Sequence, residues 1–155
     1  MNRRPSRRTK PDERRVLRAT VTVTVPFQDA DPSGAVWHGN YFRYFDTARS
    51  ALLERLGYGY RAMARSGYLW PIVDTRVRYL QGVTYGEHLD VSAVLEEWEY
   101  RLRITYEIRD RSGRRVTEGY TVQVPVAAET GEMCFGLPVN VRQRLAERIE
   151  AALDG

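Results

Sequence analysis

The chain has 155 residues, of which 43% are hydrophobic and 28% are charged, and this is the composition of one ordinary globular domain. It contains no apolar run close to the ~20 residues that a membrane-spanning helix needs, and its basic N-terminus lacks the apolar stretch of a secretory signal. Cys134 is the single cysteine, and no Cys/His cluster has metal-ligand spacing. We therefore expect a cytoplasmic protein without a disulfide, a metal or a cofactor.

The net charge of +4 is concentrated at the N-terminus. Residues 1–18 hold eight basic and two acidic side chains, and the rest of the chain holds sixteen basic and eighteen acidic ones. Such an arm is either a disordered, solubilising tail or a contact for nucleic acid or another anionic surface. No basic patch with interleaved aromatic residues follows it, so we expect no nucleic-acid partner. We predict a disordered basic tail over residues 1–14 and a single domain over residues 15–155.

Strict alternation of apolar and polar residues begins at Leu17 and runs to Phe27. The apolar positions would share one face and the threonines the other, which predicts a half-buried strand, and Pro26 would end it. Residues 28–39 are rich in turn-forming residues and predict a loop.

A helical period follows the loop. Over residues 41–56 the apolar side chains recur at i, i+3, i+4 and i+7, which predicts a long amphipathic helix. Asn40 is the expected N-cap, and Gly57 is the expected residue just after the helix end. Residues 58–67 are expected to add a short helical turn.

The rest of the chain is mostly strand. Four further strands are predicted, over residues 69–80, 88–98, 100–110 and 115–126. The segment at residues 110–113 has hairpin-loop composition, and residues 138–153 predict a terminal amphipathic helix. Successive strands with short connections imply an antiparallel sheet, which must also cover the long apolar helix. This order alone supports an α+β protein and nothing finer.

The segment over residues 29–41 carries the chemistry, and it lies between the first strand and the long helix. It is Asp-Ala-Asp-Pro-Ser-Gly-Ala-Val-Trp-His-Gly-Asn-Tyr. A helix N-terminus has unpaired N–H groups and partial positive charge, which can stabilise an oxyanion forming on a thioester carbonyl. A carboxylate held just upstream by a Pro/Gly turn can activate water or attack the carbonyl itself. Because thiolate is a good leaving group, little further machinery is needed.

This segment resembles the motif of the 4-hydroxybenzoyl-CoA thioesterase family of hotdog-fold proteins. The family carries D-x-D-x-x-G-x-V-x-(H/Y)-x-N-Y, and Phe45 and Asp46 match the aromatic and acidic residues that follow. The first half is closest to aroyl-CoA members and the second half to short-chain acyl-CoA members. The strand pattern also agrees across residues 16–127. The resemblance implies a hotdog fold, in which a curled antiparallel sheet wraps around a long central helix, and a thioesterase that hydrolyses an acyl-CoA.

The resemblance also implies roles for individual residues. Asp31 matches the catalytic carboxylate, acting as general base or as nucleophile, and the backbone N–H of His38 matches the group that polarises the thioester carbonyl. Other expected substrate contacts are Gly34, Trp37, Asn40, Tyr41 and Asp46. Arg101 falls where aroyl-CoA members carry basic residues that meet the CoA phosphates, and Arg103 is a second candidate. Family members are dimers or dimers of dimers, so we expect a homodimer or homotetramer with its sites at the subunit interface.

Several candidates also have a structural interpretation. Asp29 and Asp31 could both be turn residues, and Asp29 is expected to bond loop N–H groups. The His38 side chain could take part in acid–base chemistry, although the family accepts tyrosine there. Asp46 could form an ion pair with an arginine three residues away on the helix. Three aromatic residues could belong to the core rather than to a pocket: Trp37, Tyr41 and Tyr44.

Other functions stay open at this point. An acyl carrier protein could replace CoA as the carrier of the acyl group. His38 permits a hotdog dehydratase or hydratase, although the usual hydratase motif is missing. A non-catalytic acyl-thioester-binding protein could use the basic tail to recruit a partner, although the intact Asp31 motif argues against it. The aroyl-CoA match and the many tyrosines favour an aromatic or polyketide-like acyl group, with a short-chain group as the next candidate.

Overall fold

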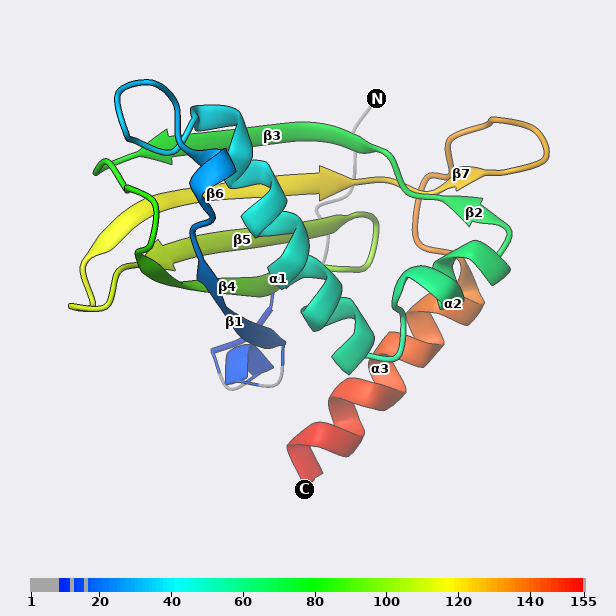
Figure 1. Ribbon diagram of the computed structural model, residues 1–155. Helices are drawn as coiled ribbons and strands as arrows, with labels where there is room; N and C mark the ends of the chain where they lie inside the picture. Colours follow the sequence, from blue (N-terminus) through cyan, green and yellow to red (C-terminus); the bar gives the residue numbers. More distant parts are fainter. Residues whose placement is uncertain (1–8, 12, 16, 155) are drawn as a thin grey trace.

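The computed structural model describes residues 9–11, 13–15 and 17–154. Five strands form one antiparallel sheet in the order β1-β4-β5-β6-β3 (Figure 1). They are β1 (Arg18–Thr24), β3 (Ile72–Tyr79), β4 (His88–Glu97), β5 (Leu102–Arg109) and β6 (Arg115–Gln123). The short strands β2 (Tyr68–Leu69) and β7 (Val126–Ala127) pair with each other. The helices are α1 (Tyr41–Arg55), α2 (Tyr60–Arg65) and α3 (Val139–Asp154), with 3-10 turns η1 (Glu13–Arg15), η2 (Phe27–Asp29) and η3 (His38–Asn40).

Helix α1 lies across one face of the sheet (Figure 1), and its apolar side forms the centre of the core. The Phe45 ring stacks on Tyr106 of β5, with centroids 4.4 Å apart and planes 11° from parallel. Gly119 on β6 leaves room for this ring, because a Cβ there would lie 3.1 Å from Phe45 and 2.4 Å from the Arg76 carbonyl oxygen. Strands β4 and β5 alternate between buried and partly exposed residues, as their sequences predict. The predicted curled antiparallel sheet around a long helix is therefore confirmed.

The order of strands differs from their order along the chain. β3 pairs with β6 and not with β4, the next strand along the chain. β4 instead lies between β1 and β5. Two predicted strands are also split. Pro71 separates β2 from β3 and Pro125 separates β6 from β7, because proline has no N–H to donate to a strand neighbour.

Of the two predictions for residues at the ends of α1, the C-terminal one is confirmed and the N-terminal one is wrong. Asn40 is not an N-cap: it has helical dihedral angles (φ −70°, ψ −20°) and makes no capping hydrogen bond. Gly57 does end the helix as predicted, with φ +73°. Its N–H donates to the Glu54 carbonyl at 3.0 Å, and the Tyr58 N–H donates to the Leu53 carbonyl at 2.9 Å. This pair of bonds is a Schellman motif.

The described part of the N-terminal arm lies against β4, which differs from the prediction of a disordered tail over residues 1–14. The Thr9 N–H donates to the Glu96 carbonyl at 2.8 Å, and Thr9 and Glu13 are buried. β4 extends past its pairing with β1, so its last carbonyls need other partners. Residues 1–8 and 12 lie outside the described residues. Within the described part, no helix is both long and apolar enough to span a bilayer.

Candidate active site

The loop between β1 and α1 is closed by hydrogen bonds between its two ends. The Trp37 N–H and the Asn40 side-chain amide both donate to the Asp29 carbonyl oxygen, each at 2.9 Å. Ala30 and Val36 form an isolated antiparallel bridge, and the Val36 N–H donates to the Val83 carbonyl at 2.7 Å. The residues around Asp31 are thus tied to the residues that begin α1.

Asp29 anchors this loop to α1 through its side chain. Its carboxylate is 2% exposed, accepts a hydrogen bond from the Tyr44 hydroxyl at 2.7 Å and forms an ion pair with Arg43. Burial, and then the hydrogen bond to Asp29, raise the pKa of Tyr44, which therefore stays a neutral donor. Asp29 thus has the structural surroundings expected of it, although its carboxylate bonds side chains and only its carbonyl bonds a loop N–H.

Asp31 lies in a tight turn that orients its carboxylate. The Ser33 N–H donates to Oδ1 at 2.8 Å, and the Ser33 hydroxyl donates to the same oxygen. The Asp31 N–H donates to the Ala35 carbonyl at 2.8 Å, and Gly34 closes the turn with φ +88°, a conformation that favours glycine. The hydrogen bond from the Ser33 hydroxyl, and then that from its N–H, lower the pKa of Asp31. The carboxylate is consequently ionised at neutral pH.

The same turn occurs a second time in the molecule. Asp110, in the β5–β6 hairpin, accepts bonds from the Ser112 N–H at 3.0 Å and the Ser112 hydroxyl at 2.6 Å, and Gly113 has φ +86°. Hydrogen bonds from Ser112 likewise lower the pKa of Asp110. The hydrogen bonding of Asp31 is therefore a property of the Asp-x-Ser-Gly turn. What sets Asp31 apart is its place on the loop that begins α1.

His38 begins the 3-10 turn η3, which continues directly into α1. Its N–H occupies a position where a helix offers no carbonyl partner of its own. The carbonyl of His38 accepts a hydrogen bond from the Tyr79 hydroxyl at 2.8 Å. This bond holds the start of the helix against the end of β3.

Aromatic rings surround this helix start. Trp37 is 52% exposed, and its ring occupies the space over Gly39, where a Cβ would lie 2.3 Å from Cζ3. The ring centroids of Trp37 and His38 are 5.0 Å apart, and those of His38 and Tyr79 are 6.4 Å apart. Trp37 is therefore a surface residue and not part of the core. Tyr41 is 3% exposed, so in this single chain it belongs to the core.

The remaining predicted residues lie elsewhere. Asp46 is exposed and forms an ion pair with Arg49 at 2.8 Å, the structural alternative considered for it. Arg101 pairs with Glu97 at 2.9 Å, and the Arg103 guanidinium lies 4.0 Å over the Tyr120 ring.

Both of these arginines are at the far end of β4 from the Asp31 loop. The Val83 carbonyl bonds that loop, and Val83 precedes the first residue of β4. Arg103 pairs with Glu97, the last residue of β4. Ten extended residues span roughly 30 Å. One chain does not bring the arginines to Asp31, and their role in binding CoA stays a prediction.

Ser33 and Tyr79 join the site without having been predicted for it. Ser33 could have been found from the Asp-Pro-Ser-Gly sequence, because Asp commonly bonds the backbone two residues on in such turns. Tyr79 carried no sequence signal, since it lies on a distant strand. The described residues contain no group of three His, Cys, Asp or Glu that could hold a metal, and the expectation of a metal-free site stays a prediction.

Comparison with known proteins places the chain in a family. Residues 25–149 match the family described as the Thioesterase-like superfamily, and the chain belongs to it. The 1,4-dihydroxy-2-naphthoyl-CoA hydrolase of Thermosynechococcus vestitus is 29% identical over 132 residues, which are 84% of each chain. The 4-hydroxybenzoyl-CoA thioesterase of Pseudomonas sp. is 26% identical over 113 residues, 71% of this chain and 77% of that protein. YneP of Bacillus subtilis is 31% identical over 103 residues, 66% of this chain but only 65% of that protein.

Solved structures agree on the fold. A DHNA-CoA thioesterase from Staphylococcus aureus superposes with a TM-score of 0.77 at 24% identity, covering 88% of this chain and 93% of that one. A 4-hydroxybenzoyl-CoA thioesterase mutant in complex with 4-hydroxybenzoyl-CoA gives a TM-score of 0.72 at 18% identity, covering 83% and 99%. The predicted family and the predicted hotdog fold are confirmed, and the predicted enzyme class, thioester hydrolase, is that of the family.

Proposed function

We propose that this protein hydrolyses the thioester of an acyl-CoA to the free acid and CoA, with Asp31 as the catalytic carboxylate. The observation that carries the proposal is the closed loop between β1 and α1. One part of this loop presents an ionised carboxylate on Asp31, and its end is the N–H-rich start of the helix at His38. A carboxylate beside a set of oxyanion donors is the minimum that thioester hydrolysis requires.

Two reaction sequences use these groups. In the first, Asp31 takes a proton from water as the water oxygen attacks the thioester carbonyl, and N–H groups at the start of the helix stabilise the oxyanion. The C–S bond then breaks, and the proton passes from Asp31 to the leaving thiolate. In the second, Asp31 attacks the carbonyl and expels the thiolate, and water then cleaves the resulting anhydride. Both sequences need the carboxylate to be ionised.

The pH dependence of turnover tests the hydrogen bonds of Asp31. Because these bonds lower the pKa of Asp31, activity that needs the carboxylate is present above this pKa and is lost as the pH falls through it. Ser33→Ala removes the hydroxyl that contributes most, so the pKa rises and the acid limb of the kcat/KM profile moves to higher pH. Ser112→Ala, in the equivalent turn at Asp110, is the matched control and should leave the profile in place. An unshifted limb in Ser33→Ala would mean that Asp31 is not the group titrating.

An aromatic acyl group is the substrate class that we propose. The exposed Trp37 ring, with His38 and Tyr79 beside it, offers aromatic faces next to the Asp31 loop. Offset stacking and edge contacts between rings add stabilisation beyond the area they bury. Two relatives are named for aromatic acyl-CoA substrates, which supports the same class.

Thiol release from a panel of thioesters tests both the reaction and the acyl group. We expect turnover of benzoyl-CoA with a kcat/KM at least about tenfold above that of palmitoyl-CoA, the size of effect that a shaped pocket produces. Butyryl-CoA is expected between them. A preference for the long chain would contradict the aromatic assignment. Turnover of a benzoyl carrier protein without turnover of any CoA ester would contradict the choice of CoA, and no turnover at all would contradict the reaction.

We also propose that the protein assembles as a homodimer or a dimer of dimers. β3 forms one edge of the sheet, and the large apolar residues along it and just after it are exposed: Ile72, Val73, Tyr79 and Leu80. An open edge with apolar side chains is a surface that proteins normally cover. Because Tyr79 also bonds the start of α1, a second copy on this edge would lie next to the Asp31 loop.

A further inference from the structure

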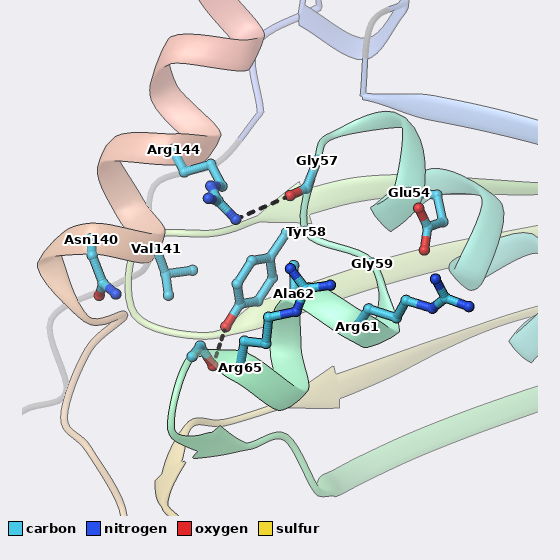
Figure 2. Close-up of a pocket in the computed structure, with 11 residues that line it drawn as sticks. Glu54, Gly57, Tyr58, Gly59, Arg61, Ala62, Arg65, Asn140, Val141 and Arg144 are labelled. Atoms are coloured by element: carbon cyan, nitrogen blue, oxygen red, sulfur yellow. Dashed lines mark hydrogen bonds between the residues drawn. The ribbon is translucent and has the colours of Figure 1, made fainter.

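A cavity of about 420 Å³ lies between the C-terminal end of α1, helix α2 and the first turns of α3 (Figure 2). This volume is within the range of small-molecule sites. The Asp31 loop lies at the other end of α1, and the 15 residues of α1 span about 20 Å at 1.5 Å per residue. The cavity is therefore separate from the candidate active site.

The charged residues of this cavity are mostly cationic. Arg61 and Arg65 come from α2 and Arg144 comes from α3, while Glu54 is the one acid among the lining residues. Within the described residues none of the three guanidinium groups forms an ion pair with a carboxylate, and Arg144 has only a 3.5 Å hydrogen bond to the Gly57 carbonyl. Like charges gathered without counter-ions repel one another, and a bound anion relieves this repulsion.

Many other arginines among the described residues do have a carboxylate partner. Eight of those described form ion pairs with carboxylates: Arg14, Arg43, Arg49, Arg78, Arg101, Arg109, Arg114 and Arg115. In the described part of the chain, the Glu54 carboxylate is not paired with any of the three cavity arginines. It lies against Gly59, where a Cβ would be 2.0 Å from Oε1.

One wall of the cavity is held rigidly. The Tyr58 side chain is 2% exposed, and its hydroxyl donates to Ser66 Oγ at 3.0 Å and accepts from Trp70 Nε1 at 3.1 Å. In Figure 2, Arg65 and Arg144 lie on either side of the Tyr58 ring, while Arg61 points toward the outside. Both of these arginines thus line the cavity beside a fixed aromatic ring.

We propose that this cavity is a second ligand site, which binds a phosphate-bearing small molecule through Arg65 and Arg144. Guanidinium groups match the oxygens of phosphate with paired, charge-assisted hydrogen bonds. The phosphate could belong to a nucleotide or to a simple phosphate ion, and the site uses the same chemistry for both.

Calorimetric titration of the full-length protein tests this site with two probes, inorganic pyrophosphate and adenosine 3′,5′-bisphosphate. We expect saturable binding of at least one probe, weakened about tenfold in Arg65→Gln and in Arg144→Gln, the loss typical of one charge-assisted hydrogen bond. Arg111→Gln, an exposed arginine of the β5–β6 hairpin, is the matched control and should bind like the unmodified protein. A bisphosphate preference would identify a nucleotide ligand, and equal affinities would show that the phosphate alone is recognised.

Two results would overturn the proposal. One is the absence of binding by either probe at millimolar concentration. The other is binding that is unchanged in both cavity variants, above all if Arg103→Gln alone weakens it, because the probe would then occupy the predicted CoA surface. Thermal unfolding of each variant checks that it is folded. Because the readout is binding and not turnover, the outcome is independent of whether the protein is a thioesterase.

Discussion

Asp31→Asn is expected to lower kcat for thioester hydrolysis at least roughly a hundredfold, the contribution of a positioned base or nucleophile. The amide has the shape of the carboxylate, and its oxygen can still accept the bonds that Ser33 donates to Oδ1. The turn should therefore persist while the basic and nucleophilic oxygen is lost. Steady-state thiol release from benzoyl-CoA measures the effect.

The chain supplies a matched control in Asp110→Asn. Asp110 occupies the same Asp-x-Ser-Gly turn and accepts the same two bonds from its serine, in addition to bonds from Arg114, but it lies in the β5–β6 hairpin. This variant should retain full activity. If Asp31→Asn were as active as Asp110→Asn, Asp31 would be only a turn residue, and Asp29 and His38 would be the next groups to test.

The two reaction sequences are separated by a single turnover in ¹⁸O-labelled water. If Asp31 acts as general base, the label enters the product acid directly. If Asp31 is the nucleophile and water attacks its side of the anhydride, the label enters Asp31 first, and mass spectrometry of the peptide containing Asp31 detects it.

Phe45→Ala is expected to lower the free energy of unfolding by about 3–5 kcal/mol, the usual cost of removing a large aromatic side chain from a core. Phe45 is fully buried, and it is the residue through which α1 stacks on the sheet at Tyr106. Gly119 has no side chain with which to fill the space left behind, so a cavity should remain. Urea unfolding at one fixed protein concentration measures the change.

Phe135→Ala removes the same side chain from a loop where it is 79% exposed. It should change the unfolding free energy by less than about 0.5 kcal/mol, as surface substitutions usually do. A loss in Phe45→Ala no greater than that of the control would contradict the packing of α1 on the sheet. Both variants lose the same phenyl ring, so any difference in their unfolding free energies is due to the position of that ring, buried or exposed.

Local structure could be predicted wherever neighbouring residues decide it. The apolar period of α1 and the alternation of β4 and β5 both appear in the structure, because each reflects which side of an element meets the core. Gly57 ends α1 as predicted, since a positive φ is favourable mainly for glycine. The candidate motif also needed only a short stretch of chain, so Asp31 and the helix start at His38 could be placed on one loop.

Features that depend on distant partners could not be predicted in this way. β3 pairs with β6, because the sheet must close around α1, which lies between β1 and β3 in the chain. No pattern of neighbouring residues predicts this strand pairing. Asn40 bonds the Asp29 carbonyl instead of capping α1, since the loop folds back on itself. Thr9 bonds the exposed end of β4, although its own segment looks disordered by composition.

The sequence by itself determined most of the elements of this protein, its family motif and the residue proposed for its chemistry. Tertiary structure decided the strand order, the anchoring of the Asp31 loop by Tyr44 and Tyr79, and the distance of Arg101 and Arg103 from that loop. It also created the arginine-lined cavity, by bringing α2 and α3 together. The physical reason is the same throughout: propensity and periodicity act between near neighbours, whereas burial and hydrogen bonding join residues that only the folded chain brings into contact.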